Sequence, residues 1–237
     1  MSGKFIRTEM LLGKAAMEKL KNSRVAVFGV GGVGGYTVEA LARSGVGTID
    51  VIDNDEVALS NLNRQIIATV NTVGMAKVEV AKQRILSINP NAVVNVHNTF
   101  YLPENSDEFD FSAYDYVVDA IDTVTAKISL VMKCNEAGTP IISSMGTGNK
   151  LNPCELEVTD IYKTSVCPLA RVMRKELKDR GVKKLKVVYS KEEPVKPILS
   201  EGAENTPGRR ATPGSTAFVP SVAGLIIASE VIKDLIG

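Results

Sequence analysis

The order of hydrophobic and polar residues predicts strands and helices that alternate along most of the chain. Short apolar runs end at glycine or at an acidic residue, and most precede a segment with hydrophobic residues three and four positions apart. The runs are typical of buried strands, and the longer segments are typical of amphipathic helices. Strands that alternate with helices indicate an α/β protein with a mainly parallel sheet.

The same pattern predicts where the elements lie. Strands are expected at 24–30, 48–53, 93–97, 114–120, 140–144, 156–161 and 185–190. Helices are expected at 33–44, 77–88, 125–137, 169–180 and 219–236, and a short first helix is expected from Met10, Leu11, Ala15, Met17 and Leu20. Residues 192–214 are rich in Pro, Gly and Ser and predict a long, flexible loop. We expect a single domain, with a nucleotide-binding half at 1–150 and a substrate half at 151–237.

A glycine-rich motif directly follows the first predicted strand and opens the next helix. It contains Gly29, Gly31, Gly32 and Gly34 in the pattern GxGxxG. Glycine lets the backbone approach a phosphate, and the helix N-terminus offers free N–H groups. Asp53 ends the second predicted strand, where a carboxylate can accept a hydrogen bond from a ribose hydroxyl. The combination favours a nucleotide site over a tight turn without a ligand.

Further charged residues favour ATP over a dinucleotide. Arg64 and Lys77 follow soon after Asp53, and their charges suit a triphosphate. Asp119 and Asp122 come at the end of the predicted strand 114–120, where ligands collect in open parallel sheets. An acid at that place is suited to hold Mg²⁺. Each of these residues alone is typical of a surface charge or a helix cap, so the prediction depends on their joint placement.

Composition excludes several protein classes. The 237 residues are 44% hydrophobic with a net charge of +1, which argues against disorder. Cys134, Cys154 and Cys167 show no CxxC spacing, which argues against a disulfide scaffold or a zinc ribbon and favours the reducing cytoplasm. The apolar stretch at 218–228 is too short to span a bilayer, so no membrane insertion is expected, and no secretory signal is visible.

The charge is unevenly distributed along the chain. Residues 101–122 include seven acids and no Lys or Arg, whereas 163–196 hold eleven Lys or Arg against four acids. The second segment suits a nucleic-acid backbone, and an ordinary solvated helix is the alternative. Arg209 and Arg210 are expected to close over the site or to contact RNA. Within 163–196, the residues expected to form the basic surface are Arg171, Arg174, Lys175, Lys178, Arg180, Lys183, Lys184 and Lys186.

Five stretches carry a family resemblance: GVGGVGG (29–35), IDNDEVALSNLNRQ (52–65), GMAKVE (74–79), INPNA (88–92) and VVDAIDTVTAK (117–127). With them, the sequence resembles the ThiF/MoeB/HesA superfamily of ATP-dependent adenylating enzymes. The resemblance implies a Rossmann-like, doubly wound sheet with helices on both faces, a homodimer, and ATP with Mg²⁺ as cofactors.

The resemblance also implies roles for individual residues. Asp53 would hold the ribose, Arg64 and Lys77 the phosphates, and Asp122 the Mg²⁺. Asn61 and Gln65 would line the reacting phosphate, and Arg7 would reach into the partner subunit's ATP site. The expected nucleotide-binding set is Gly29, Gly31, Gly32, Gly34, Asp53, Asp55, Asn61, Arg64, Gln65, Lys77 and Asp122. The expected catalytic set is Asn61, Arg64, Lys77 and Asp122.

The second half of the chain is similar to one branch of that superfamily. The stretches SMGTGNKLNP (144–153), DIYKTSVCPLARVMRKELKDRGV (160–182) and VVYSKEEP (187–194) resemble the tRNA threonylcarbamoyladenosine dehydratases. That branch implies cyclisation of a modified adenosine on tRNA. The alternative is adenylation of the C-terminal glycine of a ubiquitin-like sulfur carrier, although enzymes of that kind usually carry two CxxC pairs. A nicotinamide-binding oxidoreductase is a further alternative from another class.

Separate predictions concern Cys167, which lies within the stretch at 160–182, and His97, which lies outside all of these stretches. Cys167 begins the basic helix, where the helix dipole favours a thiolate that could form a thioester. The alternative, which we favour, is that Cys167 packs as a small hydrophobic residue. His97 is the only histidine and has no histidine or cysteine partner nearby in sequence, so we expect it not to be catalytic.

Overall fold

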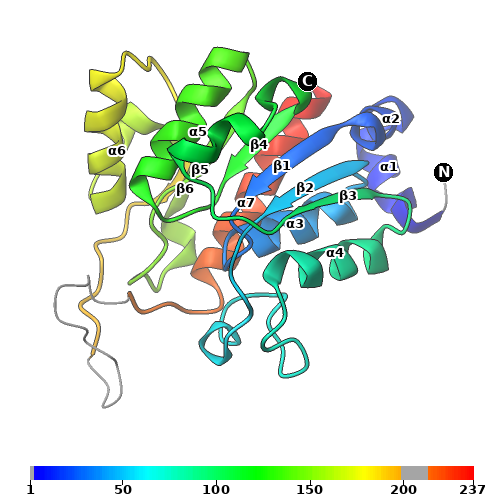
Figure 1. The fold of residues 1–237 in the computed structure, drawn as a ribbon, viewed down its shortest axis with the longest axis horizontal. Helices are drawn as coiled ribbons and strands as arrows, with labels where there is room; N and C mark the ends of the chain where they lie inside the picture. Colours follow the sequence, from blue (N-terminus) through cyan, green and yellow to red (C-terminus); the bar gives the residue numbers. More distant parts are fainter. Residues whose placement is uncertain (1–2, 199–212) are drawn as a thin grey trace.

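The computed structural model describes residues 3–198 and 213–237. A seven-stranded sheet crosses the molecule, with helices on both faces (Figure 1). The strand order is β3-β2-β1-β4-β5-β7-β6, and the described pairs are parallel apart from β6 with β7. The strands are β1 (Arg24–Phe28), β2 (Thr48–Ile52), β3 (Val93–His97), β4 (Tyr116–Asp119), β5 (Ile141–Ser144), β6 (Leu156–Asp160) and β7 (Lys186–Ser190).

The helices form two layers on the sheet. They are α1 (Ile6–Leu12), α2 (Lys14–Asn22), α3 (Gly34–Arg43), α4 (Lys77–Ile88), α5 (Val124–Ala137), α6 (Pro168–Asp179) and α7 (Val219–Ile236). One face of the sheet packs against α2, α3, α4 and α7. The other face packs against α5, α6 and the 3-10 turns η3 (Pro103–Glu108) and η4 (Phe111–Ala113).

Side chains of β1 alternate between the two layers. Val25 and Val27 pack on the α3 and α7 side, and Ala26 and Phe28 pack on the α5 side. On that side the ring centroid of Phe28 lies 5.0 Å from the centroid of the Tyr101 ring. Because both faces of β1 are buried, its sequence is a continuous apolar run rather than an alternating one.

The predicted fold class and the order of the elements are confirmed. The bounds of α4, β3 and α7 agree with the prediction, and the other strands and the later helices begin and end within two residues of it. Of the predicted loop at 192–214, the structure describes 192–198 and 213–214, which form no helix or strand. Arg209 and Arg210 lie outside the described residues. None of the described helices combines the length and the hydrophobicity needed to cross a membrane.

The prediction of one helix at the start of the chain is wrong. Gly13 has a positive φ of 83° and separates α1 from α2. Met17 and Leu20 of α2 are buried in the core, whereas Met10 and Leu11 of α1 are 79% and 87% exposed. The apolar residues that looked like one stripe therefore belong to two helices, and α1 contacts the core through its partly buried last residue, Leu12.

The strand order reverses between β1 and β4. The strands β2 and β3 lie on one side of β1, whereas β4 and β5 lie on the other. In open parallel sheets, ligands bind at the carboxyl ends of the strands at such a point. The segments that follow these strands therefore frame the candidate site.

Candidate functional site

A cavity of about 460 Å³ opens at the carboxyl ends of the parallel strands. Segments that follow β1, β2, β3, β4 and β5 contribute to its walls, together with the starts of α4 and α7. Predicted site residues from distant parts of the chain meet in this cavity. They are Gly29, Gly31, Gly32, Asp53, Asp55, Asn61, Arg64, Gln65, Lys77 and Asp122.

The glycine motif turns the chain from β1 into α3. Gly29 has a φ of +89°, and a Cβ at this position would lie 2.7 Å from the Ala120 carbonyl oxygen. Gly34 does not line the cavity: a Cβ there would lie 1.8 Å from the Gly29 carbonyl oxygen. Gly34 thus allows close packing of α3 on the strand end, while Gly31 and Gly32 present backbone to the cavity.

Asp53 follows β2 and fixes the glycine loop. Its carboxylate accepts hydrogen bonds from the Val30 N–H at 2.7 Å and the Asp55 N–H at 2.9 Å. These two backbone donors hold the carboxylate at the cavity wall. An ionised carboxylate has about four acceptor sites, so Asp53 can accept further hydrogen bonds from a ligand hydroxyl.

Lys77 is the first residue of α4 and brings a buried positive charge to the cavity. It is only 5% exposed, and its Nζ donates to Asp55 Oδ2 at 2.7 Å. The Lys77 N–H also donates to the Asp55 carbonyl oxygen at 2.9 Å. The Asp55 side chain is largely exposed, so the pair holds the ammonium group in place without burying the carboxylate.

The turn η2 (Leu59–Asn61) and the residues after it supply three more side chains. Asn61 Oδ1 accepts a hydrogen bond from the Ala58 N–H at 3.0 Å, which fixes the amide. Arg64 donates to the Ser60 carbonyl oxygen at 2.7 Å. Gln65 is buried, and its Oε1 has no hydrogen-bond partner among the described residues. A buried acceptor without a partner in a cavity wall is suited to a donor from a ligand.

The turn between β4 and α5 separates the two acids that were predicted to lie together. Asp122 is exposed in the cavity wall. Asp119 is fully buried outside the cavity, and Lys127 Nζ donates to its Oδ1 at 2.9 Å and to the Ile121 carbonyl oxygen at 3.0 Å. The expectation that Asp119 belongs to the site is therefore wrong, because its side chain points from the strand into the α5 layer.

Asp122 is compatible with a magnesium site in which the nucleotide and water supply the other ligands. Across residues 3–198 and 213–237, no three His, Cys, Asp or Glu side chains lie together as a complete metal site. Mg²⁺ is commonly held by one or two carboxylates together with the phosphates of a nucleotide and water. A lone exposed carboxylate beside a phosphate-binding loop fits that mode, and Asp122 is the residue that would hold the ion.

The cavity also contains residues that the sequence analysis did not assign to the site. They are Ser144 at the end of β5, Met145, Gly146, Thr147 and Gly148 after it, and Thr99, Phe100 and Tyr101 after β3. Burial raises the pKa of the Tyr101 hydroxyl to about 12, so it stays protonated at neutral pH. The only sequence signal that could have placed these residues in the cavity wall was their position after predicted strands. It became usable only with the strand order, which puts β5 beside β4.

Asn149 ties the segment after β5 to two other parts of the chain. Its N–H donates to the Gly214 carbonyl oxygen, and its Oδ1 accepts from the Gly214 N–H, both at 2.7 Å. Its carbonyl oxygen accepts from the Val195 N–H at 2.8 Å. Asn149 has a φ of 58°, a left-handed conformation that asparagine tolerates. These bonds hold the wall that Gly148 and Pro213 form.

Cys167 and His97, which we expected not to take part in catalysis, lie outside the cavity wall. Cys167 is buried at the start of α6 and does not line the cavity. Burial raises the pKa of the Cys134 thiol, which disfavours a thiolate. Burial alone would raise the pKa of the Asp50 carboxyl, but hydrogen bonds from Arg24, His97 and Asn95 outweigh it and hold that pKa at about 2. His97 thus belongs to the hydrogen-bond network around Asp50, which joins β1, β2 and β3.

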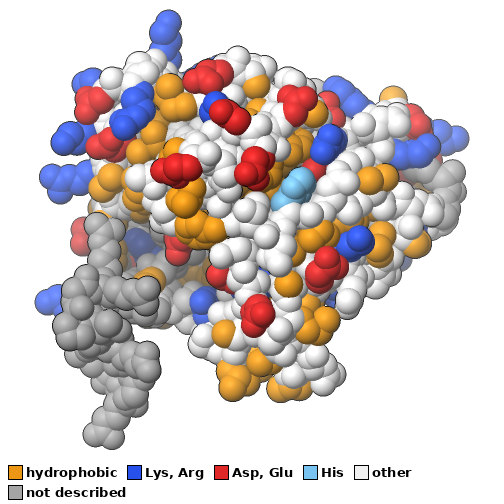
Figure 2. All heavy atoms as spheres, viewed as in Figure 1, with side chains coloured by type: hydrophobic (Ala, Val, Ile, Leu, Met, Phe, Trp, Pro, Cys, Tyr) orange, Lys and Arg blue, Asp and Glu red, His pale blue; other side chains and the backbone are white. Residues whose placement is uncertain are grey.

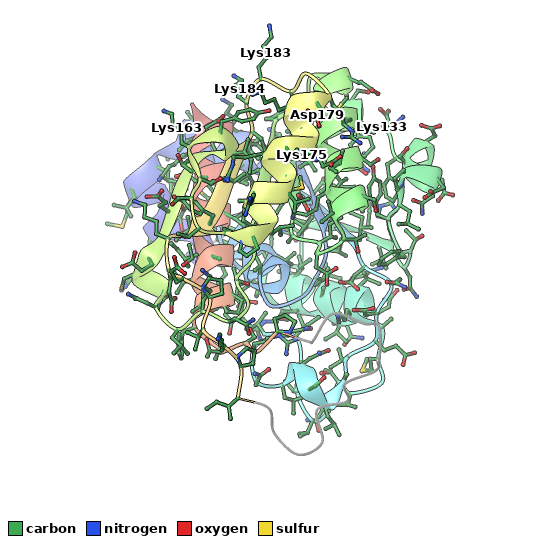
Figure 3. All side chains as sticks on the ribbon, turned by 90° about the vertical axis from the view of Figure 1, so that its left-hand side faces the viewer. Lys133, Lys163, Lys175, Asp179, Lys183 and Lys184 are labelled. Atoms are coloured by element: carbon green, nitrogen blue, oxygen red, sulfur yellow. The ribbon has the colours of Figure 1, made fainter. Side chains whose placement is uncertain are left out.

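The basic segment after residue 163 divides into exposed and engaged side chains. Figure 3 shows Lys163, Lys175, Lys183 and Lys184 on the α6 side of the molecule. The exposed members of the predicted set are Arg171, Lys175, Lys178, Arg180, Lys183 and Lys184, of which Arg180 is also paired with Glu176 at 2.7 Å. Arg174 instead donates to the Thr164 carbonyl oxygen at 2.9 Å, and Lys186 pairs with Asp234. The expectation that Arg174 and Lys186 belong to an open basic surface is wrong.

Known proteins resemble the chain along almost its whole length. The family model described as "ThiF family" matches residues 6–237. A tRNA threonylcarbamoyladenosine dehydratase of Bacillus subtilis (strain 168) is 44% identical over 241 residues, which cover 98% of this chain and 94% of the relative. The dehydratase of Escherichia coli (strain K12) is 41% identical over 182 residues, which cover 76% and 68%. The solved structure of an E. coli dehydratase, TcdA, in complex with ATP has a TM-score of 0.88 at 36% identity and covers 98% of this chain and 93% of that one.

Proposed function

The chain belongs to the ThiF family, and we propose that it is an ATP-dependent enzyme that cyclises threonylcarbamoyladenosine on tRNA. The observation that carries the proposal is a glycine-loop cavity that also presents Arg64, Lys77 and Asp122. These charges suit a triphosphate rather than the two phosphates of NAD. The similarity to dehydratases over nearly the whole chain supports the choice of substrate.

Each cavity residue has a role in this proposal. Asp53 accepts from the ribose, and the backbone at Gly31 and Gly32 approaches the phosphates. Lys77 and Arg64 offset the negative charge that develops on the phosphates in the transition state. Asn61 and Gln65 lie beside the reacting phosphate, and Asp122 holds Mg²⁺, which when bound neutralises phosphate charge.

The proposed reaction has two steps. A carboxylate oxygen of the threonylcarbamoyl group attacks the α-phosphate of ATP, and pyrophosphate leaves to give an acyl-adenylate. A nitrogen of the carbamoyl unit then attacks the activated carbonyl, AMP leaves, and a ring closes. The nucleoside loses the elements of one water, and no covalent bond to the enzyme forms. In this proposal residues 1–150 bind ATP, and the later half contributes the tRNA surface.

Mass spectrometry tests the proposed substrate. The purified protein, incubated with ATP and tRNA that carries threonylcarbamoyladenosine, should convert the nucleoside to a product lighter by one water while AMP and pyrophosphate appear. The triple variant Arg171→Glu, Lys175→Glu, Lys178→Glu should raise KM for tRNA roughly tenfold or more, because it reverses charges that face a polyanion. Its KM for ATP should stay unchanged. Unaltered tRNA together with adenylation of a carrier ending in Gly-Gly would favour the alternative function.

Cys167 should be dispensable for this reaction. Ring closure within the substrate requires no thiol, and the buried Cys167 side chain lies outside the cavity wall. We expect Cys167→Ser to retain most of the cyclisation rate, measured by nucleoside analysis, provided that thermal unfolding shows a folded variant. A thioester trapped on Cys167 would instead assign the protein to the carrier-activating branch.

A homodimer formed through α1 is also part of the proposal. Met10 and Leu11 are exposed on α1, as is Ile6 one turn earlier, and an apolar helix face of this kind usually packs against a partner. The exposed Arg7 on the same helix is then placed to approach the partner subunit. The variant Met10→Glu, Leu11→Glu should run as a monomer in light scattering, with the fold retained. A wild-type protein that is itself monomeric at micromolar concentration would contradict the proposed dimer.

A further inference from the structure

A second hollow, of about 590 Å³, lies between α5, α6 and η3. We call it the α5–α6 groove. Its walls are mainly apolar and come from Pro103, Val124, Ile128, Met132 and Val172. Figure 2 shows hydrophobic side chains in the strip between α6 and α5, and in Figure 3 the two helices lie side by side. An open apolar groove of this size is suited to a ligand with apolar faces.

The groove and the nucleotide cavity share no lining residue, but neighbouring residues of the chain line them. Three segments contribute one residue to the cavity and a residue shortly after it to the groove: Tyr101 and Pro103, Thr123 and Val124, Leu169 and Val172. Phe100, in the cavity wall on the first of these segments, is 46% exposed and presents an aromatic ring next to the junction. The two hollows therefore lie close enough for one large substrate to contact both.

The two borders of the groove carry opposite charge. On the α6 border, Arg171 and Lys175 are exposed, and Lys175 lies one helical turn after Val172. On the η3 border, Glu104 and Glu108 are exposed, whereas the exposed Asp107 is paired with Lys133 at 2.8 Å. Within the groove, Glu176 is paired with Arg180 at 2.7 Å, so it is not a free charge. An anionic chain is therefore attracted along α6 and repelled from η3.

We propose that the α5–α6 groove binds the unpaired nucleobases next to the modified adenosine, while the phosphates of that strand follow α6. The inference rests on the proposed tRNA substrate and assigns the place where its loop docks. Single-stranded RNA combines an anionic backbone with uncharged bases whose faces stack on apolar and aromatic side chains. A basic border beside an apolar groove matches that arrangement, and the acidic border on the far side fixes the direction in which the backbone lies.

Neutral substitutions separate the groove from the charges around it. The double variant Met132→Gln, Val172→Asn makes the groove polar without altering any charge. Leu225→Asn is the matched control, because Leu225 on α7 is 46% exposed, close to the 42% of Val172, and lies on the opposite face of the sheet. The probe is an RNA stem-loop whose loop carries threonylcarbamoyladenosine with 2-aminopurine as the neighbouring nucleotide, whose fluorescence rises when it leaves the RNA stack.

Wild type should raise the fluorescence of the probe and cyclise it. The double variant should bind the probe with a Kd about tenfold higher, with KM for the stem-loop raised in parallel, because it removes apolar side-chain surface that the bases would bury. Its KM for ATP should match wild type, and Leu225→Asn should match wild type in every measurement. Equal Kd values for wild type and double variant, or no fluorescence change on binding, would overturn the proposal.

The same measurements distinguish this inference from the proposed function. A wild-type protein that binds the stem-loop with a fluorescence rise but never cyclises it would contradict the proposed reaction and retain the groove as an RNA site. A wild-type protein that cyclises the stem-loop while the groove variant behaves identically would keep the reaction and overturn the groove. Absence of any RNA binding would overturn both.

Discussion

Replacement of Lys77 by methionine should lower kcat/KM for ATP-dependent turnover by roughly ten- to a hundredfold. The ammonium group is 5% exposed and is held at the cavity wall by Asp55, so methionine removes a positive charge from a place where solvent cannot replace it. A hydrogen bond to a charged group is worth about 1.5–3 kcal/mol, which corresponds to that range of rates. Pyrophosphate exchange and calorimetric titration with ATP measure the loss.

Stability should change little in the Lys77 variant, because Asp55 is largely exposed and becomes solvated once its partner is removed. Lys82→Met is the matched control: it makes the same substitution on the same helix, at a residue that does not line the cavity. If both variants had the wild-type affinity for ATP, Lys77 would have no part in nucleotide binding. If both lost activity together with thermal stability, the helix rather than the charge would be responsible.

Periodicity predicted the fold well where one face of an element is buried against the core. The helix at 77–88 and the strand at 93–97 were found at the predicted bounds because their boundaries are marked by local signals, such as Asn89-Pro90 after α4. The start of the chain shows the limit of this signal. Met10 and Leu11 are as hydrophobic as Met17 and Leu20, yet α1 leaves its apolar side exposed. Hydrophobicity alone does not tell whether a face packs within the chain.

The site was predictable where the chemistry lies within a motif. The glycine loop, Asp53, Asn61, Arg64 and Lys77 lie in ordered, closely spaced stretches, and the structure brings them to one cavity. The wall after β5 was missed, because its proximity depends on a strand order that sequence spacing does not encode.

The surroundings of the charged side chains were the hardest property to predict. Arg174 and Lys186 look like open basic residues in the sequence, but each is engaged by partners that lie close only in the folded chain. Asp119 and Asp122 also look alike in the sequence, but only Asp122 is exposed in the folded chain. Asp119 is the last residue of β4, so its side chain enters the layer beneath α5, whereas Asp122 lies in the turn beyond the strand.

Replacement of Lys127 by methionine should destabilise the fold by about 3–5 kcal/mol, the cost of leaving one member of a buried ion pair without its partner. Lys127 and Asp119 are both 0% exposed and lie 2.9 Å apart. The same ammonium group holds the Ile121 carbonyl oxygen, so the variant should also loosen the turn that carries Asp122 and weaken ATP binding. Urea denaturation and calorimetry with ATP measure the two effects.

Two further variants test the cause. Lys133 lies on the same helix as Lys127 and forms a solvent-exposed pair with Asp107 of η3. Lys133→Met breaks this pair and should leave stability near that of wild type, because exposed ion pairs contribute little. The double variant Lys127→Met, Asp119→Asn removes both charges and should recover a large part of the lost stability, since the penalty comes from an isolated buried carboxylate. A double variant no more stable than Lys127→Met would show that the cost lies in packing or in the bond to Ile121 instead. A Lys127→Met protein as stable as wild type would show that Asp119 reaches water or a proton without its partner.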